Sequence, residues 1–328
     1  MSVSDPTIFE LGESEALKRA IAHFKPGSHT LVPSGDDAAV IRSEGKYVVT
    51  TDTMVQGRDF RLDLSSARQL GIKAVATNLA DVVAMGAKPT AIVVALVVPE
   101  TTKVSWLEEF AHGLQSGIDS LFPGCEVVGG DLAAGDQVVI AVTAHGELEA
   151  EPVLRSGAKV GDQVVVAGTL GRAAAGLDLL LAPDPTLAAA YPEWVAIQLA
   201  PNPPLQTGLD LAALATSMLD ISDGLSTDAS RIAKASGVTL KLRSSALLGY
   251  EAVLELAAQS MTARGFAANE RDWVLNGGED HSFLATVPEG TKLPIGCKVI
   301  GEVVAQTADP VLLDDQPLLA RGWDSVRS

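Results

Sequence analysis

Acidic residues recur in this chain beside glycine, serine or threonine at the ends of apolar, strand-like segments. Carboxylates in such positions can converge on one cleft, where they stay ionised together only if cations neutralise them. Oxygen ligands of this kind suit Mg²⁺ or Ca²⁺ rather than zinc. The sequence therefore predicts a divalent-metal site, built from segments 34–38, 50–53, 129–132, 219–224 and 277–280.

Asp81 differs from these residues because it lies inside an apolar stretch with helical periodicity, between Leu79-Ala80 and Val82-Val83. On a helix it shares a face with Asn78 and Thr77, three and four residues earlier. A carboxylate on a face that packs into a core needs a polar partner or a metal. We therefore expect Asp81 to belong to a buried polar cluster or a metal site.

Paired glycines give a second indication of phosphate chemistry. Gly129-Gly130 and Gly277-Gly278 let the backbone approach a ligand closely, and exposed amides there can hold phosphate oxygens. The chain has no G-x-x-x-x-G-K-[ST] motif, which excludes a P-loop enzyme. Aspartates beside glycine or serine are also common turn formers and helix caps, and Asp223 is a candidate cap for the helix that follows it.

The composition of the chain limits the kinds of molecule that it can bind. The 328 residues carry a formal charge of −17, and such a surface repels nucleic acids and anionic lipids. Cys125 and Cys297 are too few for a disulfide scaffold and lie in no metal-binding spacing, so we expect buried structural thiols. The chain shows neither a signal peptide nor an apolar stretch long enough to cross a membrane. A soluble, cytoplasmic protein is expected.

Hydrophobic periodicity predicts a mixed order of helices and strands rather than strict βαβ alternation, which favours an α+β fold. A polar, turn-forming stretch at 149–160 predicts two domains, 1–149 and 150–328. Expected helices span 12–24, 66–85, 106–121, 173–181 and 226–235. Expected strands span 38–41, 47–51, 91–98, 127–128, 138–146, 163–167, 218–221, 238–242, 281–287 and 298–304, with a glycine-rich turn after residue 128.

Seven segments taken in order resemble the thiamine-monophosphate kinase family, which shares the fold of aminoimidazole ribonucleotide synthetase. Each segment alone is weak, but the ordered set is specific and covers nearly the whole chain. The segments are GDDAAV at 35–40, TTDTMV at 50–55, NLADVVAMGAKP at 78–89, VVGGDL at 127–132, LRSGAKVGD at 154–162, MLDISDGL at 218–225 and GGEDHSF at 277–283.

The resemblance implies transfer of the ATP γ-phosphoryl group to thiamine monophosphate, assisted by several Mg²⁺ ions. It also implies a homodimer in which the N-terminal domains form a shared β-barrel. Gly130, Arg155 and Ser222 would contact ATP, with Asp131 beside them. The implied metal ligands, of which Asp81, Asp220 and Asp223 would be catalytic, are Asp37 (or its neighbour Asp36), Thr50, Thr51, Asp52, Asp81, Asp131, Asp220 and Asp223.

The resemblance further implies that Glu279 and Trp323 contact the thiamine phosphate. Trp323 would stack on a positively charged ring, and Arg155 offers a planar fork for phosphate oxygens. Asp59 stands where many relatives have a histidine that faces the substrate, so this contact differs here. His281 stands where an aromatic residue is common, and we expect it to be structural.

Two other interpretations stay open. An enzyme like aminoimidazole ribonucleotide synthetase shares the chemistry, although the GGEDHS and Arg-Gly-Trp segments fit it less well. A non-catalytic metal- or nucleotide-binding relative is the other, and the intact set of aspartates argues against it. Selenophosphate synthetase and the carbamoyl-dehydrating hydrogenase-maturation protein are disfavoured, because residues 1–124 contain no cysteine and the chain ends without one.

Overall fold

The computed structural model describes residues 5–25, 27–32 and 39–323. The chain divides into two compact units, one of Met1–Val82 and Ala87–Glu149 and the other of Val83–Gly86 and Ala150–Ser328. Each unit contains both helices and a mainly antiparallel sheet, which confirms the α+β class. None of the helices in the described ranges is both long and apolar enough to cross a bilayer.

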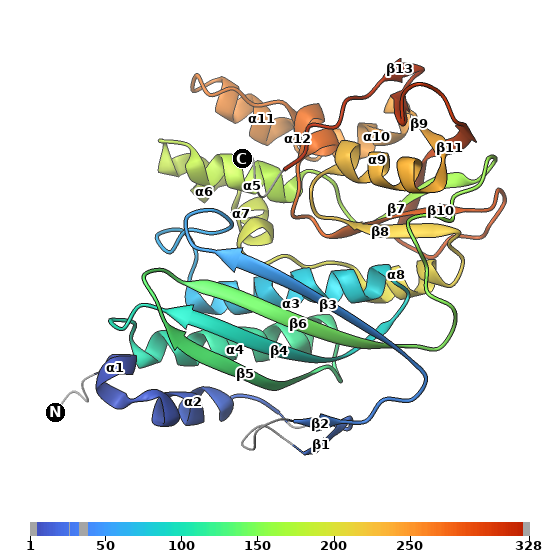
Figure 1. Ribbon diagram of the computed structural model, residues 1–328. Coiled ribbons are helices and arrows are strands. Elements are labelled where there is room, and N and C mark those ends of the chain that lie inside the picture. Colours follow the sequence, from blue (N-terminus) through green and yellow to red (C-terminus); the bar gives the residue numbers. More distant parts are fainter. Residues whose placement is uncertain (1–4, 26, 33–38, 324–328) are drawn as a thin grey trace. The chain divides into compact units, whose positions relative to one another are not determined.

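The first unit contains a four-stranded sheet in the order β3-β6-β4-β5 (Figure 1). Its strands are β3 (Lys46–Val55), β4 (Lys88–Val98), β5 (Glu126–Ala134) and β6 (Val139–Leu148). β6 runs antiparallel to both neighbours, whereas β4 and β5 are parallel. Within the described residues this sheet is open and does not close into a barrel.

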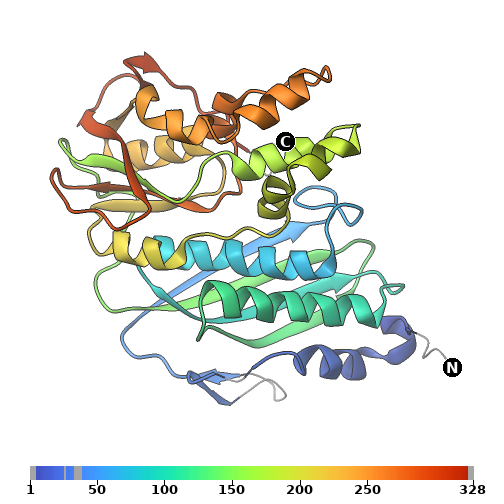
Figure 2. The same ribbon diagram turned by 180° about the vertical axis from the view of Figure 1, so that it is seen from behind.

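Helices α3 (Ala67–Ala84) and α4 (Val104–Leu121) lie side by side on one face of this sheet (Figure 2). They approach closely because glycines stand at their contact: a Cβ on Gly113 would lie 2.1 Å from the carbonyl oxygen of Arg68. Burial in β6 alternates strictly along the strand, as expected when one face is covered. The opposite, open face presents Val49, Thr51, Ala95 and Ala133.

Short elements precede this sheet. Helices α1 (Ile8–Leu11) and α2 (Glu13–Ile21) replace the single helix expected over 12–24, and a capping box of Thr7 and Glu10 fixes the start of α1. A two-stranded ribbon follows, formed by β1 (Thr30–Val32) and β2 (Val40–Ile41).

The second unit contains a seven-stranded sheet in the order β13-β12-β9-β11-β7-β10-β8. All pairings are antiparallel except that of β12 with β9. β8 and β10 are buried along their whole length, so the residues that follow β8 and precede β10 start from a rigid core. The strands are β7 (Gln163–Ala167), β8 (Ser217–Ile221), β9 (Val238–Leu242), β10 (Ser282–Val287), β11 (Cys297–Ala305), β12 (Val311–Leu313) and β13 (Gln316–Pro317).

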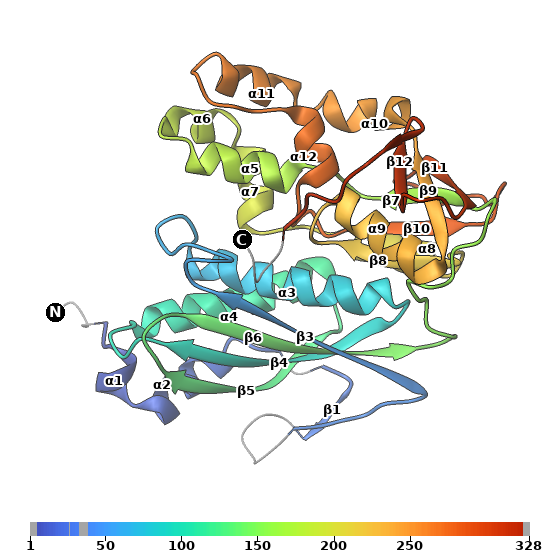
Figure 3. The same ribbon diagram turned by 45° about the horizontal axis from the view of Figure 1, so that its top comes forward.

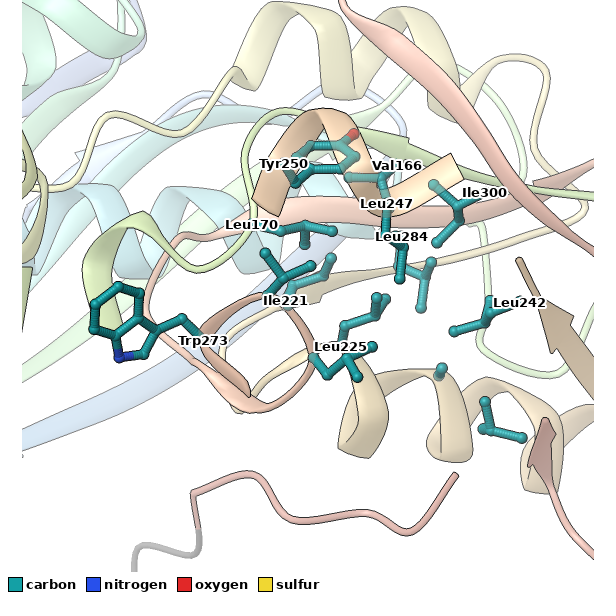
Figure 4. Packing of buried hydrophobic residues seen from close by; sticks show 14 of the residues in the cluster. Val166, Leu170, Ile221, Leu225, Leu242, Leu247, Tyr250, Trp273, Leu284 and Ile300 are labelled. Atoms are coloured by element: carbon teal, nitrogen blue, oxygen red, sulfur yellow. The ribbon is translucent and has the colours of Figure 1, made fainter. Parts of the chain in front are cut away.

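The helices of this unit pack on the sheet through a core of aliphatic side chains, with Leu225, Leu284 and Ile300 among those that converge in Figure 4. Trp273 and Tyr250 add larger surfaces at its margin. The helices are α5 (Arg172–Leu181), α6 (Pro185–Ala190), α7 (Pro192–Leu199), α8 (Leu205–Ala212), α9 (Leu225–Ser236), α10 (Ser244–Glu251), α11 (Glu255–Thr262) and α12 (Glu270–Asn276).

Three expectations are wrong in detail. Gly129-Gly130 does not form a turn after residue 128, because β5 continues through it to Ala134. Asp223 does not cap α9, whose N-cap is Gly224 with φ +106°. Of the two cysteines only Cys125 is buried, which raises the pKa of its thiol to about 12, while Cys297 is half-buried.

Candidate functional site

In the first unit, β3 and α3 bring two of the predicted metal ligands together. The hydroxyl of Thr50 lies 3.4 Å from Oδ2 of Asp81, which stands near the end of α3. Asp52 lies two residues further along β3 and so on the same face of the strand. Its Oδ1 accepts the backbone N–H of Thr53 at 2.8 Å. The edge strand β3 and helix α3 therefore present oxygen atoms that can bind a metal ion.

Thr51 lies on the other face of the same strand. Its hydroxyl donates to the carbonyl of Val142 at 2.9 Å and lies 3.4 Å from the hydroxyl of Thr143 on β6. Successive side chains of a strand point to opposite faces. The side chain of Thr51 is therefore not brought together with those of Thr50 and Asp81.

Asp59 lies in the turn that follows β3. Its Oδ2 accepts the backbone N–H of Val55 at 2.7 Å, and the backbone N–H of Gly57 donates to the carbonyl of Phe60 at 2.7 Å. The carboxylate therefore stabilises the turn, as aspartates in such positions often do. Asp36 and Asp37 lie outside the described residues.

Gly130 and Asp131 lie on β5, beside a cavity of about 720 Å³. The cavity is mainly apolar, with side chains of α2, α4 and the sheet around it, and Gly129, Gly130 and Asp131 contribute its polar margin. A Cβ on Gly130 would lie 2.3 Å from the carbonyl oxygen of Val94, whereas one on Gly129 would meet nothing within 4 Å. Gly130 is thus required by the pairing of β5 with β4.

In the second unit, Asp220 is the last but one residue of the buried strand β8 and pairs with the histidine that directly precedes β10. Nδ1 of His281 lies 3.2 Å from Oδ2 of Asp220, and both side chains are almost fully buried. The backbone N–H of His281 donates to the carbonyl of Ile221. His281 therefore orients Asp220, which is a structural role.

Asp223 forms an ion pair with Arg231, which also pairs with Asp228, a carboxylate that the sequence pattern does not indicate. Arg231 of α9 lies 2.5 Å from Oδ2 of Asp223 and 2.6 Å from Oδ1 of Asp228. Asp228 is 1% exposed, and its Oδ2 accepts the N–H of Asp223 at 3.1 Å. Burial is the main cause that raises the pKa of Asp228 to about 7; Asp220 raises it further, and Arg231 opposes both.

Ser222 and Glu279 meet through their backbones. The N–H of Glu279 donates to the carbonyl of Ser222 at 2.9 Å, and a Cβ on Gly278 would lie 2.2 Å from that oxygen. Glu279 has φ +66°, a strained backbone for a residue with a side chain. Its Oε2 accepts Nε2 of Gln198 at 2.5 Å, and Gln198 is buried on α7. Gln198 is a second residue that the sequence did not indicate.

Asp280, between Glu279 and His281, stabilises this loop. Its carboxylate accepts the hydroxyl of Thr169 at 2.7 Å and backbone N–H groups at the start of α5. Complete burial raises its pKa above the usual range, partly offset by these hydrogen bonds. Asp280 therefore has a structural role that fixes the backbone of its two neighbours.

Arg155 and Trp323 are exposed on the second unit. The carbonyl of Arg155 accepts the hydroxyl of Ser236 at 2.9 Å, which holds the backbone and leaves the guanidinium near solvent. Trp323 is 46% exposed, and its N–H donates to the carbonyl of Asp223 at 3.1 Å. The structure therefore brings Trp323, Asp223 and Ser222 into one neighbourhood, whereas Arg155 has its own contact with the end of α9.

Among the residues that the structure describes, no three His, Cys, Asp or Glu side chains stand together in a metal-binding arrangement. The predicted ligands are distributed over both units: Thr50, Asp52, Asp81 and Asp131 belong to the first, and Asp220 and Asp223 to the second.

Comparison with known proteins identifies the family. Residues 35–148 match the model of the N-terminal domain of AIR synthase related proteins. The chain is 38% identical to thiamine-monophosphate kinase of Mycobacterium tuberculosis over 329 aligned positions, which cover 99% of this chain and 95% of the relative. The chain belongs to the thiamine-monophosphate kinase family. This confirms the resemblance inferred from the ordered motifs.

Solved structures of the same family share the fold. The thiamine-monophosphate kinase of Stenotrophomonas maltophilia K279a matches with a TM-score of 0.75 and 29% identity over 92% of this chain and 95% of that one. AaThiL complexed with AMPPCP and TMP matches with a TM-score of 0.72 and 29% identity over 98% of each chain. The fold and the kinase family are therefore established together.

Proposed function

We propose that this protein phosphorylates thiamine monophosphate with ATP, giving thiamine diphosphate and ADP. The observation that carries the proposal is the 38% identity over nearly the full length of a thiamine-monophosphate kinase. A structure of similar fold that is complexed with AMPPCP and TMP supports the same pair of substrates.

In this reaction an oxygen of the thiamine phosphate attacks the γ-phosphorus of ATP in line with the leaving group. The bond from the γ-phosphorus to the β,γ-bridging oxygen breaks, and ADP leaves with that oxygen. Such transfer depends on alignment and charge neutralisation rather than on covalent catalysis. The proposed site residues fit this requirement, because they are carboxylates, glycines and an arginine and include no activated nucleophile.

The donor chemistry of the described residues fits Mg²⁺. Thr50, Asp52 and Asp81 offer only hydroxyl and carboxylate oxygens, the ligands that a hard cation prefers. In the second unit, Asp220 and Asp223 add carboxylates beside the buried Asp228. These residues, with Asp131 and Asp37, would hold the metal ions, whereas the hydroxyl of Thr51 faces the other side of β3. When bound, Mg²⁺ would neutralise phosphate oxygens and lower the repulsion between two anionic substrates.

For ATP we propose that the adenine occupies the cavity beside β5. Its apolar lining suits a planar heteroaromatic ring, and its polar margin at Gly130 and Asp131 suits the start of the phosphate chain. Arg155 and Ser222 are the other residues that we propose to contact the nucleotide. The exposed guanidinium of Arg155 can donate hydrogen bonds to phosphate oxygens, while its backbone carbonyl is held by the hydroxyl of Ser236.

For thiamine monophosphate we propose contacts with Trp323 and Glu279. The exposed ring of Trp323 is available to stack on the cationic thiazolium. Glu279 adds a carboxylate that attracts the same positive charge. Asp59, in the turn after β3, takes the place of the usual histidine and adds a second negative charge.

We further propose that the protein acts as a homodimer that pairs the open faces of two four-stranded sheets. This face is apolar or small at Val49, Ala95 and Ala133, and Val49 is 59% exposed. An identical surface on a second copy would cover it, as in an isologous interface. Val49→Arg should convert a dimer to a monomer in sedimentation experiments. Ile295→Arg, at a 99% exposed position of the second unit, should not.

The activity is tested by incubating the protein with ATP, Mg²⁺ and thiamine monophosphate and measuring thiamine diphosphate by chromatography. Product is expected, and Asp81→Asn should abolish it while the circular dichroism spectrum stays that of the wild type. Absence of product, together with ADP formed in the presence of formylglycinamidine ribonucleotide, would favour aminoimidazole ribonucleotide synthetase activity instead. Nucleotide binding without any turnover would favour a non-catalytic relative.

A further inference from the structure

Three consecutive backbone amides attach the last described residues of the chain to the start of α9 and to the turn that precedes it. The N–H of Arg321 donates to Oγ of Ser226 at 3.3 Å, and that of Gly322 donates to Oγ1 of Thr227 at 2.9 Å. The N–H of Trp323 donates to the carbonyl of Asp223 at 3.1 Å. Figure 3 shows this segment, in dark red, running past the start of α9.

The contact is close as well as hydrogen-bonded. A Cβ on Gly322 would lie 1.8 Å from the carbonyl oxygen of Asp223 and 2.5 Å from Oγ1 of Thr227. Only a residue without a side chain can bring the backbone this near. The Arg-Gly-Trp sequence therefore places the indole of residue 323 directly after a backbone contact with the Asp223 turn.

Two of the three acceptors are side chains, and they differ in how replaceable they are. Ser226 is fully buried and its hydroxyl donates to Oδ1 of Asn276, so its substitution would disturb the junction of α9 and α12. Thr227 is only half-buried, and its methyl group and backbone would remain after replacement by valine. Thr227 is therefore the position at which attachment of the C-terminal segment can be weakened alone.

We propose that Thr227 is a positioning residue that holds Trp323 against the Asp223 turn and thereby places the ring of thiamine monophosphate. The inference rests on the proposed function, in which Trp323 contacts that ring. It goes further because it assigns a role in substrate recognition to a residue of α9 that touches neither substrate. It also links the ring contact to Asp223, since the segment that carries Trp323 is hydrogen-bonded to the turn that carries Asp223.

The consequence is specific to one substrate. Loss of the Thr227 hydroxyl removes one neutral hydrogen bond from the segment that carries Trp323. The KM for thiamine monophosphate should rise about five-fold, the factor that such a bond represents. The KM for ATP and the kcat should stay near their wild-type values, because Trp323 contacts only the thiamine ring.

The test compares Thr227→Val with Thr227→Ser in steady-state kinetics with each substrate varied in turn. Hydrogen–deuterium exchange of the peptide that contains Gly322 is measured on the same proteins. Thr227→Val should exchange faster at this peptide and show the raised KM. Thr227→Ser keeps the acceptor oxygen and should resemble the wild type in both measurements. Thr291→Val, which removes an exposed threonine hydroxyl bonded to the carbonyl of Pro288, is the matched control and should change neither.

The inference is overturned if exchange at Gly322 is unchanged in Thr227→Val, or if it accelerates while the KM for thiamine monophosphate stays the same. An equal rise in both KM values would also overturn it. If Thr227→Val does not fold, Gly322→Ala replaces it, because the added methyl group would overlap the carbonyl of Asp223 and Oγ1 of Thr227 and so displace the segment. Failure of the proposed function is distinguishable: wild type would then form no thiamine diphosphate, or Trp323→Ala would keep the wild-type KM.

Discussion

Arg231 lies 2.5 Å from Oδ2 of Asp223 and, through its other terminal nitrogen, 2.6 Å from Oδ1 of Asp228. One guanidinium thus serves two carboxylates of different exposure, since Asp228 is 1% exposed and Asp223 is 23% exposed at the side chain. The buried member depends on the arginine most, because it has little water to replace a lost cation.

Arg231→Met is expected to lower the free energy of unfolding by about 1–3 kcal/mol, less than for a fully buried pair because the arginine is partly exposed. Urea denaturation measures this loss. Adding Asp228→Asn should recover part of it, since the uncompensated charge is then removed. Arg61→Met breaks an exposed pair with Asp63 and serves as the matched control, with little change expected. Equal losses in the two single variants would contradict the argument.

Gly130→Ala is expected to destabilise the first unit by about 1–3 kcal/mol, because the added methyl group would overlap the carbonyl of Val94. The pairing of β5 with β4 would shift, and with it the polar margin of the cavity, so affinity for ATP should fall as well. Calorimetry of unfolding and of ATP binding measures both effects. Gly129→Ala meets no atom within 4 Å and should stay within about 0.5 kcal/mol of wild type. A destabilised Gly129→Ala would refute this explanation.

Gln198→Met is expected to raise the KM for thiamine monophosphate about ten-fold, the cost of losing a hydrogen bond to a charged group. The amide of Gln198 donates to Oε2 of Glu279 at 2.5 Å, so the substitution removes a hydrogen bond that helps to orient this carboxylate. Steady-state kinetics should show no matching change in the KM for ATP. Gln206→Met removes a similar bond to Asp210 on the surface and should leave both constants unchanged. Parallel changes in both KM values for Gln198→Met would exclude a role through Glu279.

His23 gives a prediction for pH dependence. Burial, and then the neighbouring His112, lower its pKa below 6.5. The folded state therefore binds fewer protons than the unfolded state, and this contribution to stability is lost as the pH falls through 6.5 towards the folded pKa. Thermal unfolding should show a smaller decrease in Tm between pH 7.5 and 5.5 for His23→Gln than for wild type (about 6.5 being the unfolded pKa). Identical decreases would assign the effect to other groups.

Much of the fold follows from local sequence pattern. The strands at 163–167 and 238–242 have the bounds that the sequence predicts, because each is a mainly apolar or β-branched segment bounded by polar or glycine residues. The helix at 67–84 was expected within one residue at each end, since Gly86 stands just beyond it with φ +78°. Short helices such as α6, α7 and α8 lie in a proline-rich stretch for which the sequence pattern predicts a loop. Tertiary packing stabilises these helices.

Some residues of the candidate site can also be predicted from the sequence, whereas others are recognised only in the fold. Residue types and motifs indicate Asp81 and Asp220, because each interrupts an apolar segment, and Glu279, because it follows a pair of glycines. No local pattern reveals that Gln198 reaches Glu279, since 81 residues separate them. The sequence does not indicate Asp228 for another reason. An aspartate and an arginine three residues apart on a helix normally form an ion pair on the protein surface. Its burial comes from the packing of α9 on β8, which sequence spacing alone does not give.

The alternation of Thr50, Thr51 and Asp52 along β3 restricts how this strand can change in length during evolution or design. Insertion or deletion of a single residue within β3, ahead of Thr50, would exchange the two faces of the strand. The side chains of Thr50 and Asp52 would then turn away from Asp81, and the small residues of the open face would turn inward. Substitutions in β3 can be tested one at a time, whereas a change in its length would alter both surfaces together. Length variation among relatives should therefore fall in the turn at residues 42–45 rather than in β3 itself.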